Sequence, residues 1–289
     1  MSRVQKAILA ILVASASAIW YVVLSAPPEV LTIYFFDVGQ GDSALVTSPD
    51  GTQILIDGGP DDTVLRRLGE VMPFYDRSLD AIILTHPHAD HVNGLVNVLE
   101  RYEVGMVVDS GAVYATSAYK EWERRIRDKH IPHVIAVSGQ RMIAGGDLRI
   151  DMIAPLESFE GVSRKNVHDA MVVAELAYGE TSVLFTGDME DDLERKLLYF
   201  GVLPNTDILK VGHHGSKTST SEVLLKAVSP EMTIISSGEK NTYGHPHADV
   251  LARLRQFSIP VHRTDEEGTI VLTTDGSGMY EVTSKTVKE

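Results

Sequence analysis

Short apolar runs alternate with amphipathic segments along most of this chain, and the two periodicities predict where strands and helices lie. Strands are predicted at 31–36, 43–47, 53–56, 81–84, 106–109, 171–178, 182–186, 207–211, 233–236, 269–273 and 279–282. Helices are predicted at 61–72, 92–101, 118–129, 191–200 and 248–257, together with one that opens with a capping box at 219–222 and ends at 228. The first strands are separated by short Gly/Asp turns with hairpin spacing. We therefore expect an α/β fold of two sheets with helices outside, and not a doubly wound parallel sheet.

The amino terminus has a different pattern. Residues 7–26 carry no charge and follow Arg3 and Lys6. Twenty such residues span a bilayer as a helix, and the basic flank predicts a cytoplasmic N-terminus. We expect residues 1–29 to be a single-pass membrane anchor or uncleaved signal, with one hydrolase domain at 30–289 outside the cytoplasm. The alternatives are a signal peptide cleaved near 16–18, which would give a secreted protein, and a buried core helix.

Composition narrows the chemistry. The chain has 289 residues, 44% of them hydrophobic, and no cysteine. Disulfides, iron–sulfur clusters and Cys-rich zinc sites are therefore excluded, and any metal ligand must be nitrogen or oxygen. Arg3 and Lys6 are the only charges before Pro27, so removing them from the net charge of −14 leaves −16 for the rest. Such a surface repels nucleic acid at long range, which counts against indiscriminate binding without excluding a nuclease.

The strand predicted at 81–84 runs directly into a segment rich in metal-binding side chains. His86 and His88 lie two residues apart and share one face of an extended segment. Asp90 and His91 follow where the chain begins to turn, so they can face a second point nearby. This arrangement predicts two adjacent metal positions with imidazole and carboxylate ligands. The alternative is a polar surface loop that is rich in histidine by chance.

Further ligand-type residues follow other predicted elements. They are His168, Asp188, the pair His213 and His214, and the pair His245 and His247. Each also has an ordinary explanation: a solvated loop for His168, a turn for Asp188, and a polar helix cap for His245 and His247. Their distribution is more informative, because eight of the 11 histidines fall in these segments and in the 85–91 loop. His130, His133 and His262 remain as structural or solvated residues. The pattern predicts a catalytic metal centre assembled from several loops.

These motifs resemble the metallo-β-lactamase fold superfamily and, within it, the carboxy-terminal hydrolase domain of ComEC-type DNA-uptake proteins. The matching segments are 36–43, 57–59, 85–91, 186–188, 210–216 and 263–265, within a region of about 31–283. The resemblance implies a four-layer αββα sandwich with two metal ions at one edge.

The resemblance also implies roles for individual residues. His86 and His88 would bind the first ion, Asp90 and His91 the second, and Asp188 would bridge them. One residue of the pair His213 and His214 would complete the second site, and the other would lie behind the ligands or transfer a proton. Asp57 would support the histidine loop.

Two features depart from the ComEC-type pattern. His168 stands where that pattern commonly has Asn-x-x-Ser, and the wider superfamily uses a histidine there as third ligand of the first metal. The ComEC hydrolase also follows a multi-helix channel, whereas we expect at most one membrane helix in this chain. The first departure makes a complete two-metal site the expectation, and the second predicts that the chain does not form a channel by itself.

The expected activity is hydrolysis by a hydroxide that two divalent cations activate, Zn²⁺ first and Mn²⁺ second. Asp90, His245 and His247 are the candidate catalytic residues, and Gly215 and Ser216 are candidates for binding substrate. The leading hypothesis is a phosphodiesterase or nuclease with nucleic acid as possible substrate and the DNA-uptake machinery as possible partner. The alternatives are a small-molecule esterase, lactonase or β-lactam-type hydrolase, a non-catalytic metal-binding component of an envelope assembly, and a di-iron oxidoreductase. The oligomeric state stays open.

Overall fold

The computed structural model describes residues 2–24, 30–163 and 167–285, and within these the strands form two sheets, of eight and seven strands. The eight-stranded sheet has the order β15-β14-β1-β2-β3-β4-β5-β6. Its strands are β1 (Leu31–Phe35), β2 (Ala44–Thr47), β3 (Gln53–Ile56), β4 (Ser78–Ile83), β5 (Glu103–Asp109), β6 (His133–Ile135), β14 (Thr269–Thr274) and β15 (Tyr280–Lys285).

The seven-stranded sheet has the order β13-β12-β11-β10-β9-β8-β7. Its strands are β7 (Arg141–Ala144), β8 (Leu148–Ala154), β9 (Val173–Tyr178), β10 (Thr181–Phe185), β11 (Ile208–Lys210), β12 (Met232–Ile235) and β13 (Val261–Arg263).

Both sheets change from antiparallel to parallel along their width. In the first, β1, β2 and β3 pair antiparallel, and β3 to β6 pair parallel. In the second, β7 to β10 are antiparallel, and β10 to β13 are parallel. The carboxyl ends of neighbouring parallel strands lie at the same edge of a sheet, where α/β proteins place their ligands. The loops after β4, β10 and β11 therefore open at a shared edge.

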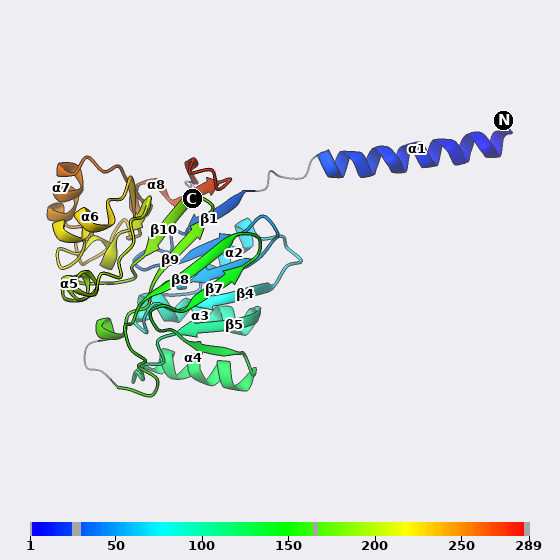
Figure 1. The fold of residues 1–289 in the computed structure, drawn as a ribbon. Coiled ribbons are helices and arrows are strands. Elements are labelled where there is room, and N and C mark those ends of the chain that lie inside the picture. Colours follow the sequence, from blue (N-terminus) through cyan, green and yellow to red (C-terminus); the bar gives the residue numbers. More distant parts are fainter. Residues whose placement is uncertain (1, 25–29, 164–166, 286–289) are drawn as a thin grey trace.

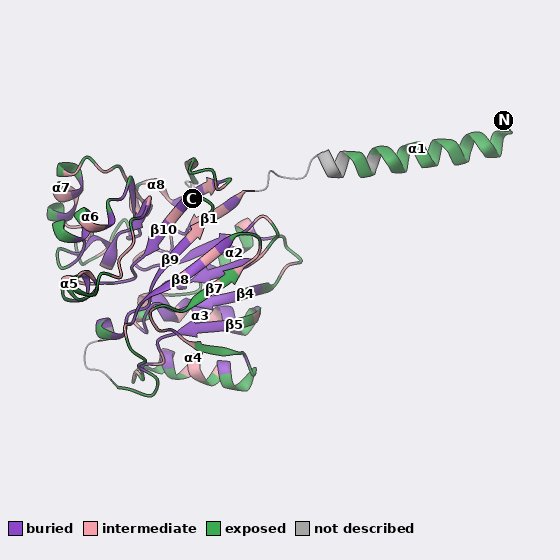
Figure 2. Ribbon diagram, viewed as in Figure 1, coloured by how far each residue is buried: buried purple, intermediate pink, exposed green. Residues whose placement is uncertain are grey.

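Helices cover the outer face of each sheet (Figure 1). One set comprises α2 (Thr63–Val71), α3 (Ala89–Arg101) and α4 (Ser117–Asp128), and the other comprises α5 (Asp191–Phe200), α6 (Glu222–Val228) and α7 (Ala248–Gln256). The helix α8 (Thr264–Glu267) joins β13 to β14. One buried cluster lies between the two sheets, and a further cluster lies between each sheet and its helices. The strands that carry these clusters appear mainly in purple, the colour of buried residues, in Figure 2. The predicted α/β fold, with two sheets inside and helices on their outer faces, is confirmed.

Several local predictions need correction. The short or polar strands β6, β7 and β13 were not predicted, and neither was the seven-residue, largely buried strand β8. The capping box at 219–222 was also wrong: Ser221 is the N-cap of α6 and accepts a hydrogen bond from the backbone N–H of Leu224. Ser219 instead donates through Oγ to the carbonyl oxygens of Gly212 and Ser216. The Ser219 hydroxyl therefore stabilises the loop that carries His213 and His214, and does not cap a helix.

Residues 7–24 of the uncharged N-terminal segment lie in the helix α1 (Arg3–Leu24), which extends away from the two sheets in Figure 1. No helix in the described ranges is long and apolar enough to cross a membrane, so the predicted membrane helix is not shown. The predicted boundary between residues 29 and 30 adjoins residues 25–29, which lie outside the described part of the chain.

Candidate metal centre

The 85–91 segment runs from the end of β4 into the first turn of α3, and one buried carboxylate fixes it. Asp57, which follows β3, accepts hydrogen bonds from the backbone N–H and Oγ1 of Thr85 at 2.8 and 2.7 Å. Its Oδ2 also lies 2.8 Å from Nδ1 of His91. Asp57 therefore orients the ring so that Nε2 of His91 faces the site, which is the usual role of a carboxylate behind a ligand histidine.

The first group of ligand-type side chains consists of His86, His88, His168 and Asp188. One donor atom from each lies within 4.8 Å of the others. His86 Nε2 is 2.9 Å from His88 Nδ1 and 3.5 Å from Asp188 Oδ2. His168 belongs to η1 (Val167–Ala170), a short 3₁₀ turn before β9. These side chains come together as the sequence predicts.

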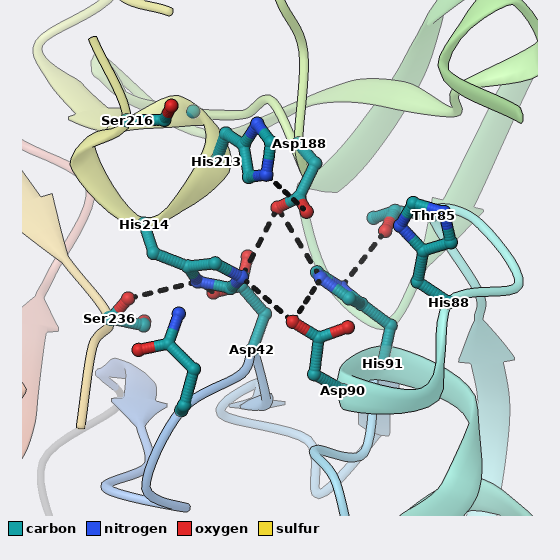
Figure 3. Close-up of polar contacts among 12 residues, drawn as sticks. Asp42, Thr85, His88, Asp90, His91, Asp188, His213, His214, Ser216 and Ser236 are labelled. Atoms are coloured by element: carbon teal, nitrogen blue, oxygen red, sulfur yellow. Dashed lines mark hydrogen bonds and ion pairs between the residues drawn. The ribbon is translucent and has the colours of Figure 1, made fainter. Parts of the chain in front are cut away.

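The second group consists of Asp90, His91, Asp188 and His214. Asp188 Oδ1 lies 3.3 Å from His91 Nε2 and 3.4 Å from His214 Nε2. Asp90 Oδ2 lies 3.2 Å from the same nitrogen of His214. Asp188 thus lies between the two groups: its Oδ2 faces His86 of the first group, and Figure 3 shows its other oxygen joined to His91 and His214 of the second.

The geometry separates His213 from His214, which the sequence could not do. Both residues lie in η2 (Gly212–Gly215) with positive φ angles of 48° and 53°. This backbone is uncommon for residues other than glycine. His214 presents Nε2 to the second group, while its Nδ1 lies 3.0 Å from the Ser236 carbonyl oxygen. His213 turns the other way, with Nδ1 3.2 Å from Glu190 Oε1 and Nε2 3.7 Å from Asp188 Oδ2.

Two buried atoms at the centre fit a cation. Within the described residues, Asp188 Oδ1 and His91 Nε2 have no hydrogen-bond partner of acceptable geometry. Unpaired buried polar atoms are costly, and convergent imidazole and carboxylate donors are ligands that zinc and similar ions accept. The residues present therefore fit two divalent cations that share Asp188.

The charges of the centre are strongly perturbed. Burial lowers the pKa of His86 to about 4, which leaves its imidazole neutral at pH 7. Burial opposes the charged form of His214 as well, but Asp188 and Asp42 outweigh it and raise the pKa of that imidazole to about 10. The pKa of Asp188 lies well below its usual range despite burial, because His214 and His91 adjoin it. The raised pKa of His214 reflects the negative charge of the carboxylates around it, which bound cations would also neutralise.

A buried ion pair behind His214 was not predicted as part of the site. Asp42 Oδ2 accepts a hydrogen bond from Nζ of Lys210 at 2.7 Å, and its Oδ1 lies 3.1 Å from His214 Nδ1. Lys210 counteracts the effect of burial and, with His214, lowers the pKa of Asp42 to about 2. A lysine within a predicted buried strand was the available signal. Glu190, which adjoins both His168 and His213, was likewise missed.

An open cleft of about 400 Å³ adjoins the two groups. Its lining includes Asp90, Asp188 and His245. His247 begins α7, and its Nδ1 accepts a hydrogen bond from the backbone N–H of Lys217. The Ser216 backbone N–H donates to the His213 carbonyl oxygen at 2.8 Å. His245 faces the cleft, in which a substrate would bind. The suggested roles of Gly215 and Ser216 in binding substrate stay predictions.

The remaining histidines lie away from this centre. His133 contacts Asp109 at 2.9 Å, and His262 contacts Glu267 at 3.0 Å. Both contacts are local ion pairs between neighbouring elements, as expected for structural residues.

The backbone of α3, which carries Asp90 and His91, contacts the backbone of residues 57–59 directly. No side chain lies between them. Gly58 N–H donates to the His91 carbonyl oxygen at 2.8 Å, and Gly94 N–H donates to the Gly59 carbonyl oxygen at 3.0 Å. A Cβ atom at Gly94 would lie 1.8 Å from the Gly58 carbonyl oxygen. Only glycine permits this contact.

Known proteins with similar sequences include ComE operon protein 3 of Bacillus subtilis (strain 168), which is 33% identical over 86% of this chain. Competence protein ComA of Neisseria gonorrhoeae is 31% identical over 85% of this chain. This chain covers 33% of each of these relatives, so it spans about a third of their length. The predicted similarity to ComEC-type competence proteins is confirmed.

A solved structure shows the same fold. CmlA, a diiron β-hydroxylase from Streptomyces venezuelae, has a TM-score of 0.51 at 15% sequence identity. The match covers 82% of this chain and 53% of CmlA. At this identity the similarity concerns the fold alone.

The family comparison agrees with the fold and the ligand groups. The model of the metallo-beta-lactamase superfamily matches residues 36–239, a range that contains both ligand groups. This chain belongs to the metallo-beta-lactamase superfamily and has its metallo-hydrolase fold.

Proposed function

We propose that this protein hydrolyses phosphodiester bonds at a dinuclear metal centre. The observation that carries the proposal is Asp188, whose two carboxylate oxygens face two separate ligand groups. The similarity to competence proteins supports a nucleic acid as the phosphodiester. His86, His88 and His168 would hold one ion, Asp90, His91 and His214 the other, and Asp188 both.

The ions, when bound, supply an activated hydroxide and stabilise charge on the phosphoryl oxygens. The chain supplies orientation. Asp57 holds His91 from behind, and the Ser236 carbonyl oxygen and the Asp42 carboxylate face Nδ1 of His214. These contacts fix the nitrogen that each ring presents to the site. His245 lies on the cleft wall, where burial and the nearby His214 and His213 lower its pKa to about 4. A neutral imidazole there can accept a proton or a hydrogen bond from a group in the cleft.

A substrate panel tests the proposal. The full chain, loaded with Zn²⁺ or Mn²⁺, is assayed on bis-p-nitrophenyl phosphate, single-stranded DNA and nitrocefin. Phosphodiester cleavage without nitrocefin turnover is expected. The acidic composition, with a net charge of −14, favours the second candidate, a small-molecule ester, lactone or lactam hydrolase. Turnover of such substrates with no phosphodiester cleavage would replace the first candidate by the second.

Asp188→Asn is the sharpest variant. It keeps the size of the side chain but removes the charge that faces both ligand groups. Activity should fall by more than the roughly 100-fold that loss of a residue behind a metal ligand costs, with the metal content measured in parallel. Asp192→Asn is the matched control, because the Asp192 side chain is 97% exposed. Full activity of Asp188→Asn would refute the bridging role.

We further propose that α1 attaches the hydrolase domain to the cell membrane and that the enzyme serves DNA uptake. The large apolar side chains of α1 that are exposed, among them Ile8, Leu12 and Trp20, motivate the first part. Membrane fractionation of the full chain and of a chain lacking residues 1–29 tests attachment. Loss of transformation in a strain carrying only Asp188→Asn tests the role in uptake, and normal transformation would contradict it.

A further inference from the structure

Two tyrosines line the cleft beside the ligand groups, and they are held differently. Tyr114 packs against the core beneath the first sheet, and its ring lies 6.0 Å from that of His88. Tyr243 is 67% exposed and, within the described residues, belongs to no hydrophobic cluster. It stacks on His245, with ring centroids 5.8 Å apart and planes 22° apart. Packing of the core therefore does not explain its place on the cleft wall.

The loop that carries Tyr243 is fastened mainly by the side chain of Asn241. Asn241 Nδ2 donates to the carbonyl oxygens of Gly238 and His245 at 2.7 and 2.6 Å. Asn241 Oδ1 accepts a hydrogen bond from the His245 backbone N–H at 2.9 Å. The backbone on both sides of Tyr243 is thus fixed, while its ring stays open to solvent. An aromatic ring fixed in this way loses little conformational entropy when it binds a flat ligand.

The charge of the chain limits how it can hold a nucleic acid. A net charge of −14 does not favour a basic groove along the phosphate backbone. Affinity must then come from the metal centre and from contacts that do not depend on charge. Stacking of bases on aromatic side chains is such a contact, and it requires bases that are not already stacked in a duplex.

We infer that Tyr243, backed by His245, is a stacking site for an unpaired nucleobase next to the phosphodiester in the cleft. The inference rests on the proposed function and narrows its substrate class to single-stranded nucleic acid. Every base has an aromatic face, so the site would accept any sequence.

The experiment compares two oligonucleotides with the full chain loaded with Mn²⁺. One is an intact single strand with a single labelled cleavage position, and the other lacks the bases that flank this position. The measured quantity is the ratio of kcat/KM for the intact to the abasic strand. Tyr243→Ala should lower this ratio about tenfold, and Tyr243→Phe should preserve it, because phenylalanine also stacks. Tyr199→Ala, at an exposed aromatic outside the cleft, is the matched control and should leave the ratio unchanged.

Two outcomes overturn the inference. An unchanged ratio in Tyr243→Ala would show that no base stacks there, and an equal loss on both strands would show that Tyr243 acts on the metal centre through His245. If the wild-type chain cleaves neither strand, the proposed function fails instead. Equilibrium binding of the same two strands to wild type and Tyr243→Ala then decides the stacking site: equal weakening, or none, rejects it.

Discussion

Asp42 and Lys210 form a buried ion pair, and Asp42 also contacts His214, a candidate metal ligand. Lys210 donates to Asp42 from one side, and His214 contacts Asp42 from the other. A buried pair adds little net stability when complete, but removing one partner leaves an uncompensated charge. The pair therefore places a charged group beside His214, and the loss of either partner should lower stability.

Lys210→Met should destabilise the protein strongly, because Asp42 then loses its hydrogen-bonded cation and keeps only the His214 imidazole beside it. We expect a loss of about 3 kcal/mol in the free energy of unfolding, measured by urea titration in EDTA. Lys226→Met, which breaks the exposed pair with Glu222, should change it by less than about 0.5 kcal/mol. Equal losses in the free energy of unfolding for Lys210→Met and Lys226→Met would show that the buried pair contributes no more to stability than the exposed pair.

At the level of single residues, the sequence pattern singled out most of the ligand-type side chains that the structure brings together, but fewer of the residues behind them. His86, His88, Asp90, His91 and Asp188 follow strand ends, so a one-dimensional pattern is enough to find them. The choice between His213 and His214 depends on two consecutive residues with positive φ, which the residue types do not reveal. Asp42 and Glu190 reach the site only through tertiary contacts.

At the level of elements, the predicted strands were those with continuous apolar runs. The strands β6 and β13 have three residues each, and β7 has exposed residues at alternate positions. Such edge strands are polar and short, and sheet pairing rather than local sequence determines them. The hairpins at the start of the chain, by contrast, could be predicted because adjacent residues determine their turns. Their spacing indicated the two-sheet arrangement.

The edge strand β6 is joined to β5 by a pH-dependent contact. The hydrogen bond that His133 donates to the Asp109 carboxylate raises the pKa of the imidazole above its ordinary value, against partial burial. A raised pKa means that the stabilisation is complete below about pH 6.5 and is lost as the pH rises through the folded-state pKa. His133→Gln should therefore cost more stability at pH 6 than at pH 9.

The difference should be below about 1 kcal/mol because His133 is partly exposed. Urea unfolding of both proteins in EDTA measures it without a contribution from metal binding. His130→Asn, at an exposed residue with positive φ, is the control and should show no such trend. A cost for His133→Gln that is the same at both pH values would contradict the contact.

At the level of the whole molecule, the metal centre lies where the two halves meet. His86, His88, Asp90 and His91 come from the first sheet and its helix, whereas His168, Asp188 and His214 come from loops of the second. Bound ions would therefore link two layers that otherwise meet through apolar side chains.

Removal of metal should lower the thermal stability of the whole domain. Binding at a thousandfold excess over Kd stabilises by about 4 kcal/mol per site, so emptying both sites with EDTA should lower Tm by roughly 20 °C. Differential scanning calorimetry with and without Zn²⁺ measures the shift. Asp188→Asn should show a clearly smaller shift, and a wild-type Tm that is insensitive to EDTA would contradict the link.

The close approach of Gly94 to the Gly58 carbonyl oxygen has a consequence for how this enzyme tolerates mutation. Asp90 and His91 sit one turn before Gly94 on the same helix, so their distance from the other ligands depends on how closely two backbones touch. One added methyl group at Gly94 would push the helix outward and widen the centre, although every ligand would still be present. Alleles with intact ligands and no activity should therefore occur at this glycine, and aligning ligand residues alone would miss them.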